Sequence, residues 1–282
     1  MATSEKTCNL GLYEKAMPGD LSFVQMLQAA GQAGFDHVEL SIDESDRRLA
    51  RLDWDRDQWR QIAAAQNQVG LAFRTMCLSG HRKYPLGHPD PAVRRRSLDI
   101  MEKALALADF LGIRIIQLAG YDVYYEKGDA QTRALFQENL ARCADMAARY
   151  GVLMGFETME TPFMDTVGKA MGFVAAIHSP YLGVYPDLGN LTNAAVKYQG
   201  DLYADLGCGR GHLLAMHLKE TRPGQYRDME FGSGHVDFPQ GVETARALGV
   251  NLFVTEFWHD GRPDWQDRLA SVRAFIRRQT GI

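Results

Sequence analysis

The 282-residue chain has 46% hydrophobic and 23% charged residues and a formal net charge of −4 at pH 7. This composition is typical of a globular protein with a large core, and the negative charge gives no general reason to expect a nucleic acid or an anionic membrane as a partner. The sequence contains no apolar run of membrane-spanning length and no apolar signal-peptide core near residue 1. The four cysteines are far apart and form no CxxC pair, so we expect reduced thiols in a cytoplasmic protein.

Short apolar runs alternate along the chain with longer segments of helical periodicity. The runs predict strands over 10–13, 37–42, 71–78, 113–120, 152–159, 182–186, 213–216 and 252–255. The segments between them predict helices over 21–33, 55–69, 91–111, 131–149, 167–177, 198–206, 240–248 and 263–278. Residues 43–53 and 221–238 are expected to be loops.

Eight strand–helix pairs in a chain of this length predict an α/β fold, a single (β/α)8 TIM barrel over residues 1–282. Strands that are apolar throughout are typical of a parallel sheet covered on both faces. An open doubly wound sheet is the alternative, but such sheets usually carry a glycine-rich dinucleotide loop after the first strand. The sequence has no GxGxxG there, so the barrel is favoured.

Four predicted strands end in a potential metal ligand: Glu157, Asp187, His217 and Glu256, which follow one another at intervals of about 30 to 40 residues. Because consecutive strand ends are neighbours at one mouth of a barrel, we expect these side chains to meet. Carboxylates and one imidazole suit a divalent ion such as Mn²⁺, Co²⁺, Zn²⁺ or Mg²⁺. Singly, each acid would usually be a helix cap or a solvated carboxylate, and His217 a core residue. The joint pattern is what predicts a metal site.

Basic residues gather near the predicted mouth of this acidic protein and suggest an anionic substrate. They are Lys15, His81, Arg82, Lys83, Lys219 and Arg222. After the seventh strand, where barrel enzymes often bind a phosphate, the segment 231–234 (FGSG) offers backbone N–H groups at Gly232 and Gly234. Solvated surface charges and a flexible turn are the simpler alternatives for these two features.

Several segments carry a resemblance to a known family. They are 10–16 (LGLYEKA), 51–54 (RLDW), 76–79 (MCLS), 116–125 (IQLAGYDVYY), 185–191 (YPDLGNL) and 236–238 (VDF). On these segments the chain resembles the L-xylulose 5-phosphate 3-epimerases, also called L-ribulose-5-phosphate 3-epimerases or hexulose-6-phosphate isomerases. That family belongs to the xylose isomerase-like TIM barrels and acts in bacterial L-ascorbate catabolism. The Gln117–Tyr125 block is specific to it, whereas the Asp-Phe pair at 237–238 is shared with many related barrels.

The resemblance implies that the four strand-end residues are the metal ligands and that Glu157 and Glu256 also form the acid/base pair. It implies a sugar phosphate as the substrate, and we expect Glu14 and Lys15 of the first matching segment to contact it. The family also favours a homodimer.

We therefore predict a metal-dependent isomerase that inverts C3 of a ketopentose 5-phosphate, converting L-xylulose 5-phosphate to L-ribulose 5-phosphate through a cis-enediolate. The alternative within the same chemistry is an unphosphorylated ketose such as L-ribulose. Related free-ketose epimerases carry His and Glu where this chain has Asn190 and Phe163, which argues against that alternative. Two alternatives come from other classes of protein. An apurinic endonuclease would need many zinc-binding histidines at strand ends. A metal-binding protein without catalytic activity would bind the cation but exchange no substrate proton.

Overall fold

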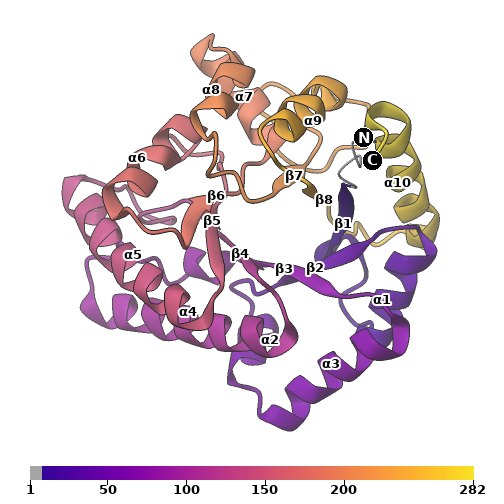
Figure 1. Ribbon diagram of the computed structural model, residues 1–282, viewed down its shortest axis with the longest axis horizontal. Helices are drawn as coiled ribbons and strands as arrows, with labels where there is room; N and C mark the ends of the chain where they lie inside the picture. Colours follow the sequence, from indigo (N-terminus) through magenta and orange to yellow (C-terminus); the bar gives the residue numbers. More distant parts are fainter. Residues whose placement is uncertain (1–7) are drawn as a thin grey trace, which may run out of the picture.

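Eight parallel strands form a ring with helices around it in this computed structural model, which describes residues 8–282 (Figure 1). The strands are β1 (Asn9–Tyr13), β2 (His37–Ser41), β3 (Phe73–Leu78), β4 (Ile115–Leu118), β5 (Leu153–Phe156), β6 (Leu182–Val184), β7 (Met216–Leu218) and β8 (Leu252–Thr255). Apart from one partly exposed position in each of β1, β4 and β5 and one exposed position in β3, the strand residues are buried. The predicted α/β barrel is therefore confirmed.

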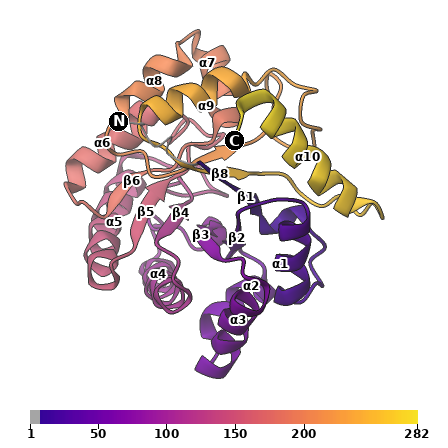
Figure 2. The same cartoon turned by 45° about the vertical axis from the view of Figure 1, so that its right-hand side comes forward.

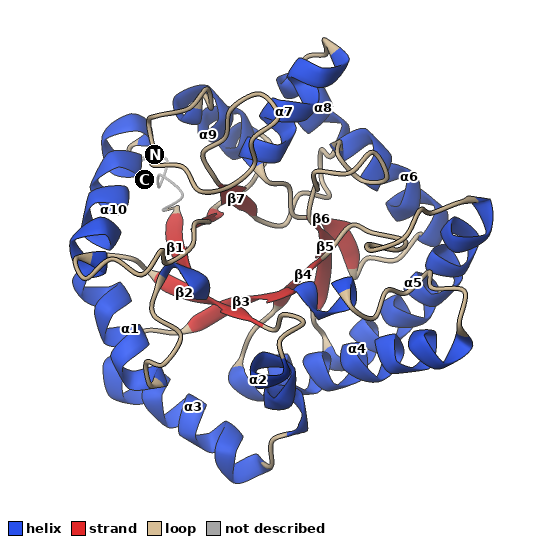
Figure 3. Cartoon of the chain, turned by 180° about the vertical axis from the view of Figure 1, so that it is seen from behind, coloured by secondary structure: helices blue, strands red, loops and turns tan. Residues whose placement is uncertain are grey.

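The helices lie outside the ring, as the views in Figures 2 and 3 show. They are α1 (Phe23–Gln32), α2 (Asp46–Leu49), α3 (Arg56–Val69), α4 (Pro91–Leu111), α5 (Ala130–Tyr150), α6 (Val167–Ile177), α7 (Leu188–Tyr198), α8 (Leu202–Cys208), α9 (Phe238–Ala247) and α10 (Trp265–Thr280). The short 3-10 helices are η1 (Glu14–Ala16), η2 (Ala50–Asp53) and η3 (Ser79–Arg82). None of the helices within residues 8–282 is both long and apolar enough to span a membrane.

The pairing between β6 and β7, where the ring closes, differs from the pairing between the other adjacent strands. The continuous ladder runs β6-β5-β4-β3-β2-β1-β8-β7. In the described part of the chain, its two ends are joined only by isolated parallel bridges, Val184 with Leu213 and Asp187 with His217. The His217 N–H donates to Pro186 O at 2.9 Å. The second bridge therefore sets two of the predicted metal ligands beside each other.

The segment between β6 and β7 corrects the predicted elements. The sequence predicted one helix over 198–206, but the structure has α7 beginning directly after Asp187 and α8 ending at Cys208. Asp187 caps α7 by accepting a hydrogen bond from Asn190 N at 2.6 Å. Helix α7 was missed because Gly, Asn and Thr, which are weak helix formers, fill its first turns. His217 lies within β7 rather than after it, and the predicted loop over 43–53 contains α2 and η2.

Candidate metal centre and substrate pocket

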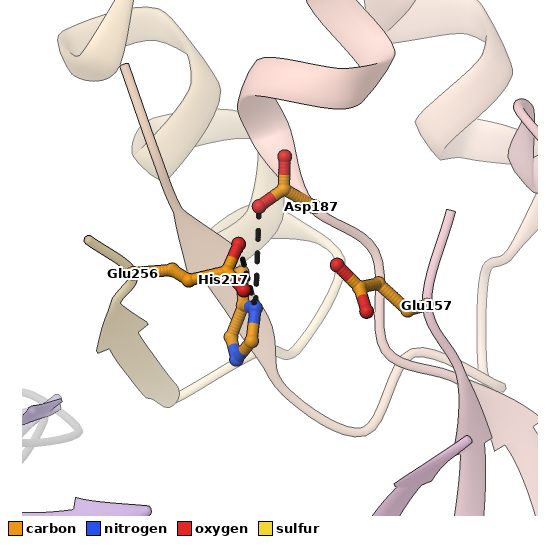
Figure 4. Close-up of side chains that lie close together, drawn as sticks. All are labelled: Glu157, Asp187, His217 and Glu256. Atoms are coloured by element: carbon orange, nitrogen blue, oxygen red, sulfur yellow. Dashed lines mark ion pairs between the residues drawn. The ribbon is translucent and has the colours of Figure 1, made fainter. Parts of the chain in front are cut away.

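The four predicted ligands converge where strands β5 to β8 end. Glu157 and Glu256 directly follow β5 and β8, Asp187 precedes α7, and His217 lies in β7. One ligand atom from each lies within 4.8 Å of the others, and all four side chains are buried (Figure 4). The barrel thus brings together residues that are up to 99 positions apart in the chain.

The donor set of this cluster fits a divalent cation. The buried atoms Asp187 Oδ2 and Glu256 Oε2 accept no hydrogen bond from any described residue. His217 Nδ1 lies 4.0 Å from Asp187 Oδ2 and 3.6 Å from Glu256 Oε2. Buried carboxylate oxygens are costly unless they are paired or bound to a metal. A cation among these oxygens and the imidazole nitrogen would satisfy them.

Lys219 brings a second buried charge to the same carboxylates. Its Nζ lies 3.0 Å from Glu256 Oε2 and 3.4 Å from Asp187 Oδ2, in ion pairs that lack the geometry of hydrogen bonds. Burial lowers the pKa of Lys219, but the neighbouring carboxylates outweigh burial and raise that pKa above its ordinary value. Lys219 therefore stays protonated and offsets part of the negative charge of the cluster.

The carboxylates of the cluster differ in how readily they ionise before any cation binds. Burial and the charge of Glu256 raise the pKa of Glu157 to about 8. Burial also raises the pKa of Asp187, to about 6, against the opposing effect of Lys219. For Glu256 burial is outweighed by Lys219 and His217, which hold its pKa below its usual range. At neutral pH Glu157 accordingly holds a proton while Glu256 is ionised.

A chain of buried contacts orients the His217 ring. Its Nε2 lies 2.6 Å from Glu39 Oε1, and the Tyr185 hydroxyl donates to Glu39 Oε2 at 2.9 Å. Gln117 Nε2 lies 3.1 Å from Nδ1 and 3.2 Å from Nε2. Glu39 thereby leaves Nδ1 to face the cluster, the arrangement by which a second carboxylate commonly orients a metal-binding histidine. Sequence reasoning missed Glu39, although an acid within the apolar run of β2 was a usable signal.

A pocket opens over the cluster at the mouth of the barrel. It is lined by Glu157, Glu256 and Lys219 and also by residues that sequence reasoning did not select, among them Arg227 and Trp258. A neighbouring pocket shares Lys219, Glu256, Arg227 and Trp258, so the two pockets adjoin at this edge. Arg227 was missed because it lies in the long segment after β7, which has no periodic pattern to indicate where its side chains point.

The structure brings only some of the predicted substrate-binding residues to this pocket. Lys15, Arg82 and Lys219 line it. Glu14 instead forms a buried ion pair, with its two carboxylate oxygens each 2.7 Å from a guanidinium nitrogen of Arg51. His81 is also buried elsewhere, with Nε2 3.1 Å from Ser97 O under α4. The geometry therefore gives Glu14 and His81 partners within the protein, away from the residues that line the pocket, and their substrate contact stays a prediction.

The glycine-rich segment after β7 is bound internally. Gly232 N donates to Glu220 Oε2 at 2.8 Å, and Val236 N donates to Glu220 Oε1 at 3.2 Å. A Cβ atom at Gly234 would collide with the same carboxylate and with Thr221 O. Arg222 Nε donates to Ser233 O at 3.0 Å. The loop thus folds around the protein's own carboxylate, and the Gly232 N–H and the Arg222 side chain have partners within the protein. The phosphate contacts expected at Arg222, Gly232 and Gly234 stay a prediction.

The chain matches a known family. Residues 27–279 match the Xylose isomerase-like TIM barrel family, and the chain belongs to it. A curated relative, L-ribulose-5-phosphate 3-epimerase UlaE from Salmonella paratyphi A, is 40% identical over 273 residues, which are 96% of this chain and 95% of that protein. These matches confirm the predicted resemblance and the prediction of an isomerase-class enzyme, a carbohydrate epimerase.

Solved structures show the same fold at lower identity. D-psicose 3-epimerase in the presence of D-fructose aligns with a TM-score of 0.79 at 17% identity, over 97% of this chain and 100% of that one. A xylose isomerase-like TIM barrel protein from Mycobacterium smegmatis in complex with magnesium aligns with a TM-score of 0.70 at 17% identity, over 96% of each chain. At this identity the comparison supports the fold.

Proposed function

We propose that this protein is a metal-dependent 3-epimerase that interconverts L-xylulose 5-phosphate and L-ribulose 5-phosphate. The observation that carries the proposal is the pair of buried glutamates, Glu157 and Glu256, in one pocket with Asp187, His217 and a rim of cations. Forty per cent identity to an L-ribulose-5-phosphate 3-epimerase supports the choice of substrate. A homodimer in the cytoplasm remains our prediction for the form and place in which it acts.

A divalent cation held by Glu157, Asp187, His217 and Glu256 would polarise the C2 carbonyl and stabilise the charge that develops on the substrate oxygens. One glutamate then removes the C3 proton from one face of the sugar, and a cis-enediolate forms. The other glutamate returns a proton to the opposite face, which inverts C3. Two bases are needed because one base would tend to return the proton to the face from which it came.

Hydrogen exchange at C3 tests the proposal directly. The Mn²⁺-loaded protein is incubated in D₂O with L-xylulose 5-phosphate and, separately, with free L-ribulose, and both are followed by NMR. We expect deuterium at C3 of the phosphorylated sugar together with its epimer. Exchange with the free sugar alone would replace the proposed substrate by an unphosphorylated ketose, and no exchange with either would refute the epimerase chemistry.

Cation affinity is expected to rise with pH between about 6 and 8. Glu157, with a pKa near 8, and Asp187, with a pKa near 6, are protonated below these values and must lose their protons to act as ligands. Calorimetry with Mn²⁺ in two buffers of different ionisation enthalpy measures this loss. Proton release is expected to be substantial at pH 7 and to fall toward zero above pH 8. An affinity independent of pH in this window would contradict the assigned ligands.

Replacing Glu39 by Gln is expected to weaken cation binding by about 10- to 100-fold, because Glu39 orients His217 and raises its basicity. Equilibrium dialysis against Mn²⁺ measures the change. Glu243→Gln, which removes an exposed carboxylate on α9, is the matched control and should bind the cation as the natural protein does. Equal affinities in both variants would remove Glu39 from the site.

A further inference from the structure

A hollow opens at the mouth of the barrel opposite the metal cluster, where the strands begin. Its volume is about 390 Å³, within the ~300–1,000 Å³ that small-molecule sites usually occupy. Arg74, Arg114, Asn9 and Asn251 line it together with apolar residues, and none of the described residues that line it is acidic. This mouth of a barrel usually serves stability rather than activity, and the proposed function uses none of these residues.

The ladder places Arg74 and Arg114 beside each other at this mouth. They directly precede Thr75 and Ile115, which are paired in register between β3 and β4. Neighbouring strands lie about 4.8 Å apart, and like charges side by side across a sheet destabilise it. Arg114 Nη1 lies 2.9 Å from Asp109 Oδ1, in a pair whose side chains are both half exposed. The Arg74 guanidinium forms no ion pair or hydrogen bond with any residue in 8–282.

Arg74 is the extra residue of a β-bulge. Between β2 and β3, Val38 pairs with Phe73. The next residue of β2, Glu39, pairs with Thr75 and so passes over Arg74. The other strand pairs of the described ladder keep their register. Bulges commonly redirect a side chain, which accounts for an exposed arginine in a strand whose other residues are buried.

A neutral imidazole lies one layer deeper in the barrel. Asn9, which lines the hollow, and Gly11 share one face of β1, and a Cβ atom on Gly11 would lie 2.3 Å from His37 Nε2. His37 is fully buried, and neither ring nitrogen has a hydrogen-bond partner within 8–282. Burial and the charge of Arg74 lower the pKa of His37 to about 3. The positive charge at the hollow is therefore that of the two guanidinium groups.

We propose that Arg74 and Arg114 bind a small oxyanion, a phosphate or a dicarboxylate, at the amino-terminal mouth of the barrel. Guanidinium groups donate paired N–H groups to phosphate and carboxylate oxygens, and an anion between two neighbouring arginines offsets their repulsion. Asn9 and Asn251 line the same hollow, and their amides offer further N–H donors. The site is independent of the proposed function, because it lies at the opposite ends of the strands from the metal cluster.

The test follows backbone amide chemical shifts of the Mg²⁺-loaded, isotope-labelled full chain during titration with inorganic phosphate, with malonate and with NaCl at matched ionic strength. We expect saturable shifts at Arg74, Ile115 and Asn251 with phosphate or malonate, and no saturable shift there with NaCl. Arg74→Gln and Arg114→Gln should each weaken anion binding by about 10- to 100-fold, since each removes a charged hydrogen bond. The anion that binds more tightly identifies phosphate or carboxylate as the group recognised.

Thermal unfolding gives a second readout of the same site. Without the anion, Arg74→Gln should have a Tm equal to or above that of the natural protein, because one of two neighbouring like charges is gone. With phosphate or malonate the natural protein should gain more in Tm than the variant, since a ligand stabilises the folded state that binds it. A Tm of Arg74→Gln well below that of the anion-free natural protein would indicate a structural role for Arg74 and would overturn the proposal.

Arg95→Gln is the matched control, because it removes an exposed arginine of α4 that does not line the hollow. It should bind both anions as the natural protein does. Equal shifts with NaCl would indicate screening of two surface charges by an adventitious ion only and would overturn the inference. Shifts confined to residues around the metal cluster, or unchanged affinity in both glutamine variants, would also overturn it and leave the proposed function intact.

Discussion

Glu157→Gln and Glu256→Gln are each expected to lower kcat for epimerisation by about 10²- to 10⁴-fold. Each variant should keep C3 hydrogen exchange with one epimer only. In the proposed mechanism the two carboxylates act on opposite faces of the substrate. A variant that lacks one of them still has the base that removes the proton from one epimer and returns a solvent hydrogen to the same face. It lacks the partner that would complete inversion.

The measurement is deuterium incorporation at C3 in D₂O with pure L-xylulose 5-phosphate and pure L-ribulose 5-phosphate, at saturating Mn²⁺. The retained exchange is an internal control, because it requires a folded protein with its cation in place. We expect the two variants to retain exchange with opposite epimers. If one variant lost exchange with both epimers while the other kept both, a single base would perform both proton transfers and the two-base scheme would be wrong.

Arg51→Met is expected to lower the free energy of unfolding by about 3–5 kcal/mol, the usual cost of removing one partner of a buried ion pair. Glu14 and Arg51 are only 2% and 7% exposed, and the Glu14 carboxylate also accepts the Ser41 N–H at 2.8 Å. Burial raises the pKa of Glu14, but Arg51 and Arg48 lower it more, so the net shift is downward. The stability that this pair contributes is therefore present at neutral pH and is lost as the pH falls through the native pKa.

Urea unfolding at pH 7 measures the cost, and a second variant separates its causes. Replacing both residues by Met should recover much of the loss, because an apolar pair of similar size leaves no unpaired buried charge. Glu14→Gln should leave kcat/KM per folded molecule unchanged. A loss of less than about 1 kcal/mol in Arg51→Met, or a large rise in KM in Glu14→Gln, would return Glu14 to the substrate site that the sequence predicted for it.

The meeting of the four candidate ligands could be predicted from the sequence because a barrel converts position along the chain into position around a ring. Glu157, Asp187 and Glu256 each come after a parallel strand, so they lie at the same mouth, and neighbouring strands place their side chains next to one another. No side-chain detail was needed for this step. The prediction was less accurate for His217. Its strand was predicted over 213–216, but β7 begins at Met216 and contains His217. The residue still lies at the mouth of the barrel.

The contacts outside the cluster could not be predicted, since they depend on where side chains point within loops and across the ring. Glu39 meets His217 across 178 residues of sequence, and no local pattern in β2 identifies that partner. Glu14 directly follows β1 as Glu157 and Glu256 follow their strands, yet its carboxylate pairs with Arg51 from η2 in a buried contact. Arg227 lies in a segment that has no period, and its ring partner, Trp258, follows a different strand.

The seam between β6 and β7 would give a bound cation a part in holding the ring together. Among residues 8–282, isolated bridges alone join these strands, and the proposed ligands Asp187 and His217 lie on opposite sides of that join. A cation bound to both would cross-link the least bonded edges of the sheet and stabilise the native barrel as its concentration exceeds Kd. Amide hydrogens such as that of His217 would then exchange faster after chelation than those elsewhere in the ring, so that opening of the barrel begins at its active site.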